Sequence, residues 1–224
     1  MNILAIESSA LAAGAAVTVD GVLKAESIVN NSLTHSVTLL PMAEDVIKRS
    51  ELTINDIDLF AVSTGPGSFS GLRIGVTLAK TLAYGCGKKA VGVSTLKAIA
   101  YNLPYADRLI CPIMDARGDR LYNALYKWEN GKLIDIAAPR AITAGSLAEE
   151  ITEKVIFIGD GVFRFKEYFE ERLGNKASFA PIHLCNARAS SVAALAISED
   201  SINPMDLNPV YLRPSQAERE RENK

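Results

Sequence analysis

A glycine-rich run, GPGSFSG at residues 65–71, follows a predicted strand and opens a predicted helix. The free N–H groups and the positive dipole at the start of a helix form a natural seat for an anion such as phosphate. The run is not a Walker A loop, because no Gly-Lys-Ser/Thr follows it, and its glycines do not match the G-x-G-x-x-G spacing. Two interpretations stay open: Gly65, Gly67 and Ser68 contact the phosphates of a nucleotide, or the glycines serve the shape of a tight turn.

Two acidic residues, Glu7 and Asp115, each end an apolar run that is typical of a buried strand. In duplicated α/β folds that bind ATP between their halves, such carboxylates hold Mg²⁺-bound water or orient a nucleophile. No second carboxylate adjoins either residue, so each can equally end its strand in solvent. A Gly-Asp-Gly turn also follows a strand and precedes a helix, and its Gly159 and Gly161 complete the candidates for a nucleotide cleft.

Metal and nucleophilic chemistry find little support in the sequence. The only histidines, His35 and His183, are far apart, and no H-x-x-x-H pair places two imidazoles on one helix face. No serine stands in a G-x-S-x-G elbow. The three cysteines form no C-x-x-C pair, which argues against a zinc site or a disulfide framework and fits a reducing compartment. We expect no metal site and no catalytic residue.

The 224 residues carry 24 Lys and Arg against 26 Asp and Glu, a formal net charge of −2. Neither residues 1–100 nor residues 101–224 have a basic surplus, which argues against a protein that binds nucleic acid on its own. The chain reaches Glu7 without a basic region, so its start is not typical of a signal peptide. No apolar run approaches the ~18 residues that span a bilayer. We expect a cytoplasmic protein that does not enter membranes.

Hydrophobic periodicity predicts the same succession of strands and helices in each half of the chain. The first half is expected to form strands at 2–6, 15–20, 22–28, 59–63 and 90–93, and helices at 34–49, 71–84 and from 96 onward. The second half is expected to form strands at 109–114, 120–127, 132–136, 155–158 and near 179–184, and helices at 145–152, 163–173 and 187–198.

Two landmarks recur at nearly constant offset. The strand-ending carboxylates Glu7 and Asp115 stand 108 residues apart, and the hairpin glycines Gly21 and Gly131 stand 110 apart. We interpret the chain as a duplicated α/β fold, with subdomains at 1–104 and 105–214, each with a mixed sheet and helices, and a charged tail at 215–224. Chance similarity between two short α/β openings is the alternative. Pro41 is expected to kink or break the helix at 34–49.

The two long helices of the first half carry more apolar side chains than one core-facing stripe requires. Small residues recur every fourth position along the second of them and form a flat ridge that lets another helix approach closely. We therefore expect a docking face for another protein, with these contact residues: His35, Leu39, Met42, Val46, Leu72, Gly75, Val76, Ala79 and Ala83. The alternative is a three-layer fold that covers both helix faces internally.

Several motifs together resemble the bacterial TsaB (YeaZ) family, which supplies the partner subunit for making the N6-threonylcarbamoyl modification of adenosine 37 in transfer RNA. The resemblance covers essentially the whole chain and rests on ILAIESS at 3–9, HS at 35–36, LLP at 39–41, GPGSFSGLRIG at 65–75, MDAR at 114–117, PVYLR at 209–213 and QAER at 216–219. The long glycine motif is shared with the catalytic relative TsaD. That relative is longer and has an H-x-x-x-H metal pair, which this chain lacks.

The resemblance implies a ribonuclease-H-like fold of the actin/Hsp70/sugar-kinase type and a subunit without its own active site. Such a subunit docks on TsaD through its N-terminal half, joins the ATPase TsaE, and forms a homodimer when alone. It meets transfer RNA only through the complex, which modifies tRNAs that read codons beginning with A. No cofactor is required, and weak ATP or ADP binding in a degenerate cleft is the most that we expect. The competing hypothesis is an actin-like ATPase or small-molecule kinase that uses this cleft.

Overall fold

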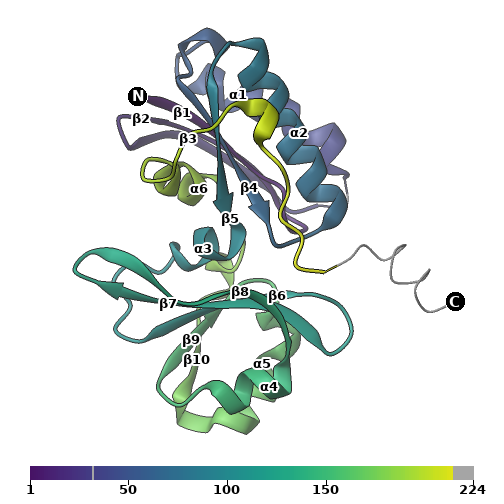
Figure 1. Cartoon of the computed structure of the whole chain (residues 1–224), viewed down its shortest axis with the longest axis vertical. Coiled ribbons are helices and arrows are strands. Elements are labelled where there is room, and N and C mark those ends of the chain that lie inside the picture. Colours follow the sequence, from purple (N-terminus) through teal and green to yellow (C-terminus); the bar gives the residue numbers. More distant parts are fainter. Residues whose placement is uncertain (32, 214–224) are drawn as a thin grey trace, which may run out of the picture.

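The computed structural model describes residues 1–31 and 33–213, which form two α/β lobes stacked along the long axis of the molecule (Figure 1). The N-terminus lies in the upper lobe, and the described chain ends beside the junction of the two lobes. The charged tail expected at 215–224 lies outside the described residues.

The upper lobe is built on a five-stranded sheet in the order β3-β2-β1-β4-β5. β1 pairs antiparallel with β2, and β2 with β3, whereas the pairs β1–β4 and β4–β5 are parallel. The strands are β1 (Asn2–Glu7), β2 (Ala13–Val19), β3 (Val22–Val29), β4 (Leu59–Gly65) and β5 (Lys89–Ser94).

The lower lobe repeats this sheet, in the order β10-β9-β6-β7-β8. The pairs β6–β7 and β7–β8 are antiparallel, and β6–β9 and β9–β10 are parallel. Read from the hairpin edge, both sheets therefore have the same strand order and the same senses of pairing, which confirms the predicted duplicated α/β fold. The strands are β6 (Leu109–Asp115), β7 (Arg120–Glu129), β8 (Lys132–Thr143), β9 (Val155–Ile158) and β10 (Ala177–Phe179).

The second hairpin turn of each lobe has the same backbone conformation. Asp20 and Gly21 have φ values of 48° and 78°, and Asn130 and Gly131 have values of 51° and 77°. Two successive positive φ values are typical of a type I′ turn, whose twist matches that of the flanking strands. Asp, Asn and Gly tolerate this conformation best, which is why Asp-Gly and Asn-Gly predicted both turns.

The helices lie close to their expected ranges, with one correction. Pro41 does not break the first helix, which runs through it as a single element of 15 residues. The helices are α1 (His35–Arg49), α2 (Phe69–Gly85), α3 (Thr95–Ala100), α4 (Ala144–Glu150), α5 (Val162–Leu173) and α6 (Ala189–Ala196), with short 3₁₀ turns at Ile54–Asp56, Gly174–Lys176, Ile182–Leu184 and Pro204–Asp206.

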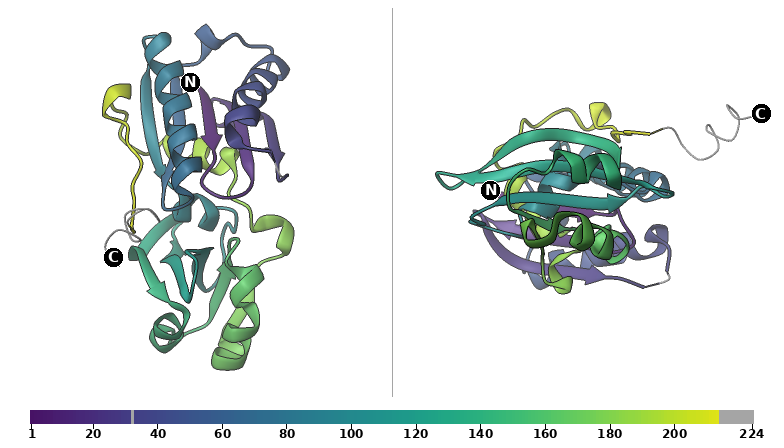
Figure 2. Two further views of the ribbon diagram at one scale, coloured as in Figure 1. Left: turned by 90° about the vertical axis from the view of Figure 1, so that its right-hand side faces the viewer. Right: turned by 90° about the horizontal axis from the view of Figure 1, so that it is seen from below.

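The upper sheet is covered by helices on both faces. Successive side chains of a strand point to opposite faces of the sheet. Leu4 and Ile6 of β1 join the core beneath α1 and α2, whereas Ile3 and Ala5 join a second core beneath α6. Figure 2 shows α1 and α2 side by side in front of this sheet. The upper lobe is therefore a three-layer sandwich, the arrangement that the sequence left as the alternative to an outward-facing ridge.

Helix α3 connects the two lobes through their cores. Its Leu96 and Ile99 pack in the core of the lower sheet, and its Ala98 packs with the α6 side of the upper sheet. All three side chains are at most 1% exposed. A helix buried on both sides fixes how the two lobes meet.

Helix α6 and the residues after it belong by their contacts to the upper lobe, although they follow β10 of the lower lobe. Val192 and Leu195 of α6 pack against the upper sheet. The next segment, residues 199–213, runs beside α2, and we call it the C-terminal strap (Figure 2). Ile202 of the strap exchanges backbone hydrogen bonds of 2.8 and 3.1 Å with Ala90, and Leu207 enters the core beneath α1 and α2. The expected subdomain at 105–214 follows chain order, whereas these contacts assign α6 and the strap as far as Tyr211, which stacks on Phe69, to the upper lobe.

Candidate functional site

The glycine run at the start of α2 packs against the chain's own turn after β1. The Ser8 hydroxyl donates a hydrogen bond of 2.9 Å to the Gly71 carbonyl, and the Ser68 N–H donates one of 2.6 Å to the Ser9 carbonyl. A Cβ at Gly67 would stand 2.3 Å from the Ser9 carbonyl oxygen, and one at Gly71 would stand 2.1 Å from that of Ser8. Both glycines are therefore needed for this close approach.

The first glycine of the run meets the C-terminal strap in the same way. The Val210 N–H donates a hydrogen bond of 2.7 Å to the Thr64 carbonyl. Gly65 has a φ of 130°, and a Cβ on it would stand 2.4 Å from the Val210 carbonyl oxygen. The Ser68 hydroxyl accepts a hydrogen bond of 3.3 Å from the Gly71 N–H and so caps α2. These contacts favour the interpretation that the glycines serve backbone packing.

Glu7 lies inside the upper lobe, where its side chain has local partners. Its residue exposure is 1%. Its carboxylate accepts hydrogen bonds from the Ser9 N–H, at 2.7 Å, and from the hydroxyls of Ser9 and Ser63. Burial raises the pKa of Glu7, while the hydrogen bonds from Ser63 and Ser9 oppose that rise. The carboxylate is enclosed by its own lobe, which differs from the cleft-facing position that the sequence suggested.

Asp115 is on the surface of the lower lobe and is engaged in an ion pair. Its two oxygens lie 3.0 and 3.1 Å from Arg164 Nη1, and it accepts a hydrogen bond of 2.7 Å from the Arg117 N–H. The carboxylate that the sequence offered for Mg²⁺-bound water is thus engaged by Arg164.

The Gly-Asp-Gly turn supports the end of β6. The Gly161 N–H donates a hydrogen bond of 3.0 Å to the Ile113 carbonyl, and a Cβ at Gly159 would stand 2.3 Å from the same oxygen. The Asp160 carboxylate between them accepts a hydrogen bond of 3.3 Å from the Asp115 N–H. Burial raises the pKa of Asp160 to about 6, and the charge of Asp115 acts in the same direction.

The structure corrects the expected set of partner-contacting residues. Eight of the nine are buried in the upper lobe itself: Leu39, Met42, Val46, Leu72, Gly75, Val76, Ala79 and Ala83. The ridge of small residues faces inward: Ser8 of the turn after β1 lies against Gly71 and Gly75, and Ala79 and Ala83 lie in the core beneath α1 and α2. A Cβ at Gly75 would stand 2.1 Å from Ser8 Oγ. The ninth residue, His35, is partly buried, and its Nε2 donates a hydrogen bond of 2.8 Å to the Ala10 carbonyl.

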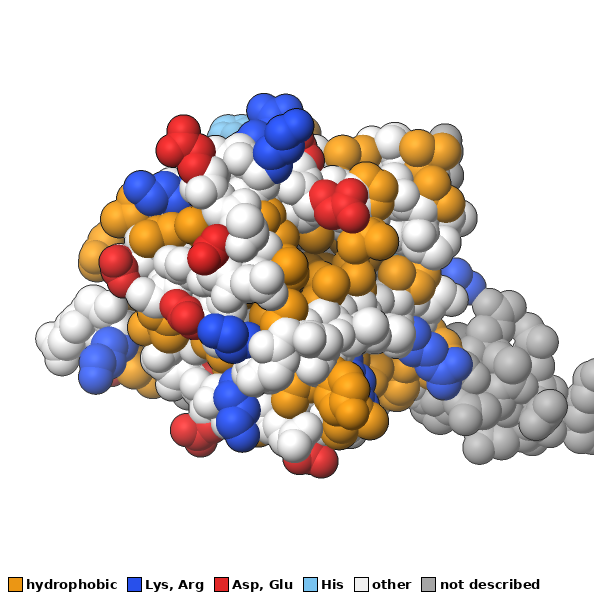
Figure 3. Space-filling view, turned by 90° about the horizontal axis from the view of Figure 1, so that it is seen from above, with side chains coloured by type: hydrophobic (Ala, Val, Ile, Leu, Met, Phe, Trp, Pro, Cys, Tyr) orange, Lys and Arg blue, Asp and Glu red, His pale blue; other side chains and the backbone are white. Residues whose placement is uncertain are grey.

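A different set of apolar side chains is exposed on the same two helices. Val37 and Leu40 of α1 are 63% and 44% exposed, Leu33 just before α1 is 57% exposed, and Tyr84 near the end of α2 is 68% exposed. We call these four residues the α1–α2 face. Seen from the end of the upper lobe, hydrophobic side chains appear on the side of these helices with few charges among them (Figure 3). The sequence signal for Val37 and Leu40 was that the first long helix carries more apolar side chains than one core-facing stripe requires.

Among residues 1–31 and 33–213, no group of three or more His, Cys, Asp or Glu side chains is placed to hold a metal ion. His35 lies in α1 of the upper lobe and His183 in the 3₁₀ turn Ile182–Leu184. Within the same described ranges, no helix is long and apolar enough to cross a membrane.

Comparison with known proteins shows to which family the chain belongs. A relative from Bacillus subtilis (strain 168), named "tRNA threonylcarbamoyladenosine biosynthesis protein TsaB", is 34% identical over 221 residues, which cover 97% of this chain and 96% of the relative. The chain belongs to the TsaB (YeaZ) family. A TsaB protein from Haemophilus influenzae is 25% identical over 80% of each chain. The family model described as "TsaD: tRNA N6-adenosine threonylcarbamoyltransferase" also matches, over residues 29–216.

The solved structures agree with this membership. YeaZ from Pseudomonas aeruginosa superposes with a TM-score of 0.78 and 21% identity, over 94% of this chain and 99% of that one. A hexokinase of the ROK family from Thermus thermophilus superposes with a TM-score of 0.51 and 10% identity, over 89% and 98%. The fold is thus that of TsaB, within the broader actin/Hsp70/sugar-kinase class that the resemblance implied.

Proposed function

We propose that this chain is a non-catalytic subunit of the assembly that forms N6-threonylcarbamoyladenosine at position 37 of transfer RNAs reading codons that begin with A. Its TsaB relatives are named for the biosynthesis of this nucleoside. A transferase of this pathway from Moorella thermoacetica is 32% identical over 116 residues, which cover 45% of this chain and 34% of that protein. This partial likeness supports a pair of paralogues, one of which carries out the transfer.

The observation that carries the proposal is the α1–α2 face. Leu33, Val37, Leu40 and Tyr84 expose apolar surface on neighbouring helices that already bury their other sides in the core. Leu33, Val37 and Leu40 stand four and three positions apart at the start of α1, and exposed apolar side chains at this spacing favour a protein partner. We propose that the TsaD paralogue docks on this face, and that a second copy of the chain occupies it when TsaD is absent. The ATPase TsaE joins the docked pair.

The contacts of the candidate nucleotide site weigh against the competing hypothesis of an ATPase or kinase. The Ser8–Ser9 turn and Val210 lie against the glycine run, and Arg164 pairs with Asp115. A chain that works as an assembly subunit can retain such a site in degenerate form, with weak ATP or ADP binding at most. Transfer RNA would then be modified by the partner, with this chain supporting the arrangement.

Reconstitution with each subunit omitted in turn tests the proposal. The chain, its TsaD partner and TsaE from the same source are combined with unmodified transfer RNA, threonine, bicarbonate, ATP and the enzyme that activates threonine. The modified nucleoside is then measured by mass spectrometry of digested RNA. We expect product only when this chain is present. Full product formation without it, or transfer by this chain without TsaD, would overturn the proposal.

A further inference from the structure

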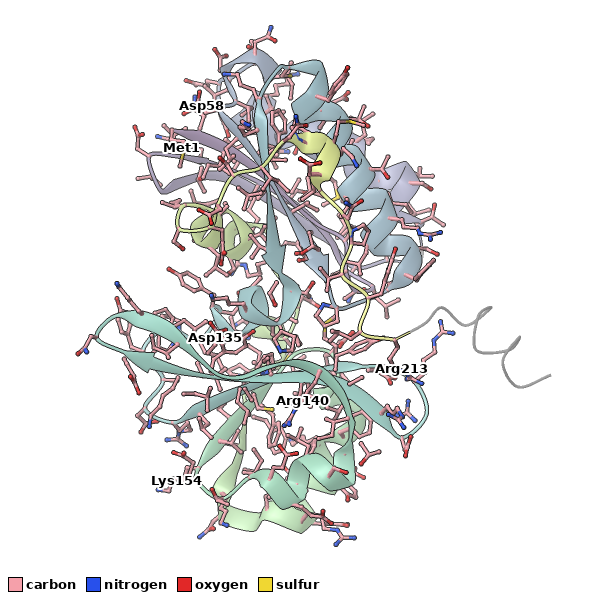
Figure 4. The ribbon with its side chains drawn as sticks, viewed as in Figure 1. Met1, Asp58, Asp135, Arg140, Lys154 and Arg213 are labelled. Atoms are coloured by element: carbon pink, nitrogen blue, oxygen red, sulfur yellow. The ribbon has the colours of Figure 1, made fainter. Side chains whose placement is uncertain are left out.

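Five arginines from four segments gather where the C-terminal strap meets the lower lobe. Arg73 of α2 donates a hydrogen bond of 3.2 Å from Nε to the Tyr211 hydroxyl of the strap. Two residues further, Arg213 Nη1 donates one of 2.6 Å to the Ala116 carbonyl, in the loop between β6 and β7. Figure 4 shows Arg213 at this junction of the two lobes.

The same loop brings in the other three arginines. Arg117 follows Ala116 directly, and the Arg120 carbonyl accepts a hydrogen bond of 3.1 Å from the Ala116 N–H. Arg164 of α5 reaches the loop through its ion pair with Asp115. Side-chain contacts place Arg164 and Arg213 at this loop and Arg73 at the strap beside it, and Arg117 and Arg120 belong to the β6–β7 hairpin itself. We call these five residues the arginine edge: Arg73, Arg117, Arg120, Arg164 and Arg213.

The arginine edge carries a local positive charge that the whole chain does not have. Guanidinium groups stay charged at any physiological pH. Three carboxylates share this region, Asp115, Asp119 and Asp160. Asp115 is bound to Arg164, and the Asp160 carboxylate accepts a hydrogen bond from the Asp115 N–H. Arg73, Arg117, Arg120 and Arg164 are exposed, so this charge faces solvent.

Aromatic rings accompany the arginines at the upper end of the edge. The rings of Phe69 and Tyr211 stack with centroids 4.4 Å apart, and the Arg73 guanidinium lies 4.0 Å from the centre of the Phe69 ring. Stacking on Phe69 and hydrogen bonding to Tyr211 hold the Arg73 head in place while leaving its outer N–H groups available. Arginines interleaved with aromatic rings are typical of surfaces that bind nucleic-acid backbones.

The position of the edge suggests which nucleic acid it meets. Arg73 lies on α2, the helix that also contributes to the α1–α2 face. Arg73 is in the first turn of α2, which lies against the start of α1, since a Cβ on Gly71 would stand 3.2 Å from His35 Cδ2. A catalytic subunit docked on Leu33 and Val37 would therefore lie close to Arg73. We propose that the arginine edge binds backbone phosphates of the transfer RNA while that RNA is held by the docked TsaD subunit. This inference rests on the proposed function, because the RNA is brought to the edge by the partner.

The test uses the complete heterodimer and unmodified transfer RNA. Arg117→Gln with Arg120→Gln removes two charges from the lower end of the edge, away from the α1–α2 face. The control variant, Lys132→Gln with Lys154→Gln, also removes two exposed positive charges, but from the β7–β8 turn and from residue 154 far from the strap (Figure 4). The dissociation constant for the RNA is measured between ~50 and ~200 mM salt, since phosphate contacts release counterions.

We expect the edge variant to pair normally with TsaD, to bind the RNA several-fold more weakly at low salt, and to lose roughly one unit of salt-dependence slope for each phosphate contact removed. The control should match the unsubstituted heterodimer. Equal affinity and slope in all three heterodimers would overturn the inference. If the unsubstituted chain does not pair with TsaD in sedimentation without RNA, the proposed function fails first, and this inference fails with it.

Discussion

The hydroxyl of Ser8 lies directly above the Cα of Gly75, so close that a Cβ at that glycine would stand 2.1 Å from Ser8 Oγ. The same hydroxyl donates a hydrogen bond to the Gly71 carbonyl one turn earlier in α2. A serine in the turn after β1 and a glycine in α2 thus form one packed unit at the carboxyl-terminal end of β1.

We expect Gly75→Ala to destabilise the fold by about 1–3 kcal/mol, although alanine is the better helix former, because the new methyl group has no space. In a Ser8→Ala background the cost should fall by about 1 kcal/mol, since the clashing oxygen is gone. Gly85→Ala in the last turn of α2 is the control, because a Cβ there meets nothing within 4 Å. Urea unfolding of the four proteins measures the coupling, and a Gly75→Ala variant as stable as the unsubstituted chain would refute this packing.

Asp160 is expected to make the free energy of unfolding depend on pH. Its pKa is about 6 in the folded chain against an ordinary value of 3.8. The folded state therefore binds this proton more tightly than the unfolded state, and the stability that it contributes is present below pH ~4 and lost as the pH rises through ~6. The loss should amount to about 3 kcal/mol at most.

Comparison with an Asp160→Asn variant isolates this effect. The stability difference between the unsubstituted chain and the variant should shift in favour of the variant as the pH rises from ~4 to ~6.5. Asp200→Asn, which removes an exposed carboxylate, provides the reference. A difference that stays constant across this range would show that Asp160 titrates as it does in the unfolded chain.

Purified alone, the chain is expected to hydrolyse no ATP above background. The glycine run is packed by the chain's own Ser8–Ser9 turn, and Asp115 is paired with Arg164. A coupled assay at millimolar ATP, with Asp115→Ala as the matched variant, measures this. Steady turnover that disappears in the Asp115→Ala variant while circular dichroism stays unchanged would favour the kinase hypothesis.

Elemental analysis of protein prepared without chelators is expected to find no stoichiometric zinc or iron. The sequence provides no histidine pair, and its three cysteines are single and scattered. One equivalent of tightly bound metal would contradict this expectation.

The fold could be predicted from the sequence because its signals are local and occur twice. Asp20-Gly21 and Asn130-Gly131 fix two equivalent hairpins, and the strand ends at Glu7 and Asp115 repeat at nearly the same offset. The family could be recognised for the same reason, since its motifs are short continuous runs.

The candidate site could not be predicted to the same depth, because its contacts join distant residues. A small residue at every fourth position looks the same whether the ridge faces a partner helix or the Ser8 turn more than sixty residues earlier. The buried Glu7 carboxylate accepts a hydrogen bond from Ser63, and the need for glycine at position 65 comes from the close approach of the Val210 carbonyl in the strap. Neither relationship leaves a periodic signal in the sequence.

The α1–α2 face is the surface on which TsaD is proposed to dock. The most direct test of this docking is sedimentation of the chain with TsaD, using Val37→Glu with Leu40→Glu. Both residues are exposed, so the variant should keep its fold by circular dichroism, and its affinity for TsaD should fall roughly tenfold or more because two charges enter an apolar contact. Val22→Glu, at an equally exposed apolar residue of β3, should pair normally. A folded Val37→Glu, Leu40→Glu variant that binds TsaD as tightly as the unsubstituted chain would show that TsaD does not dock on the α1–α2 face.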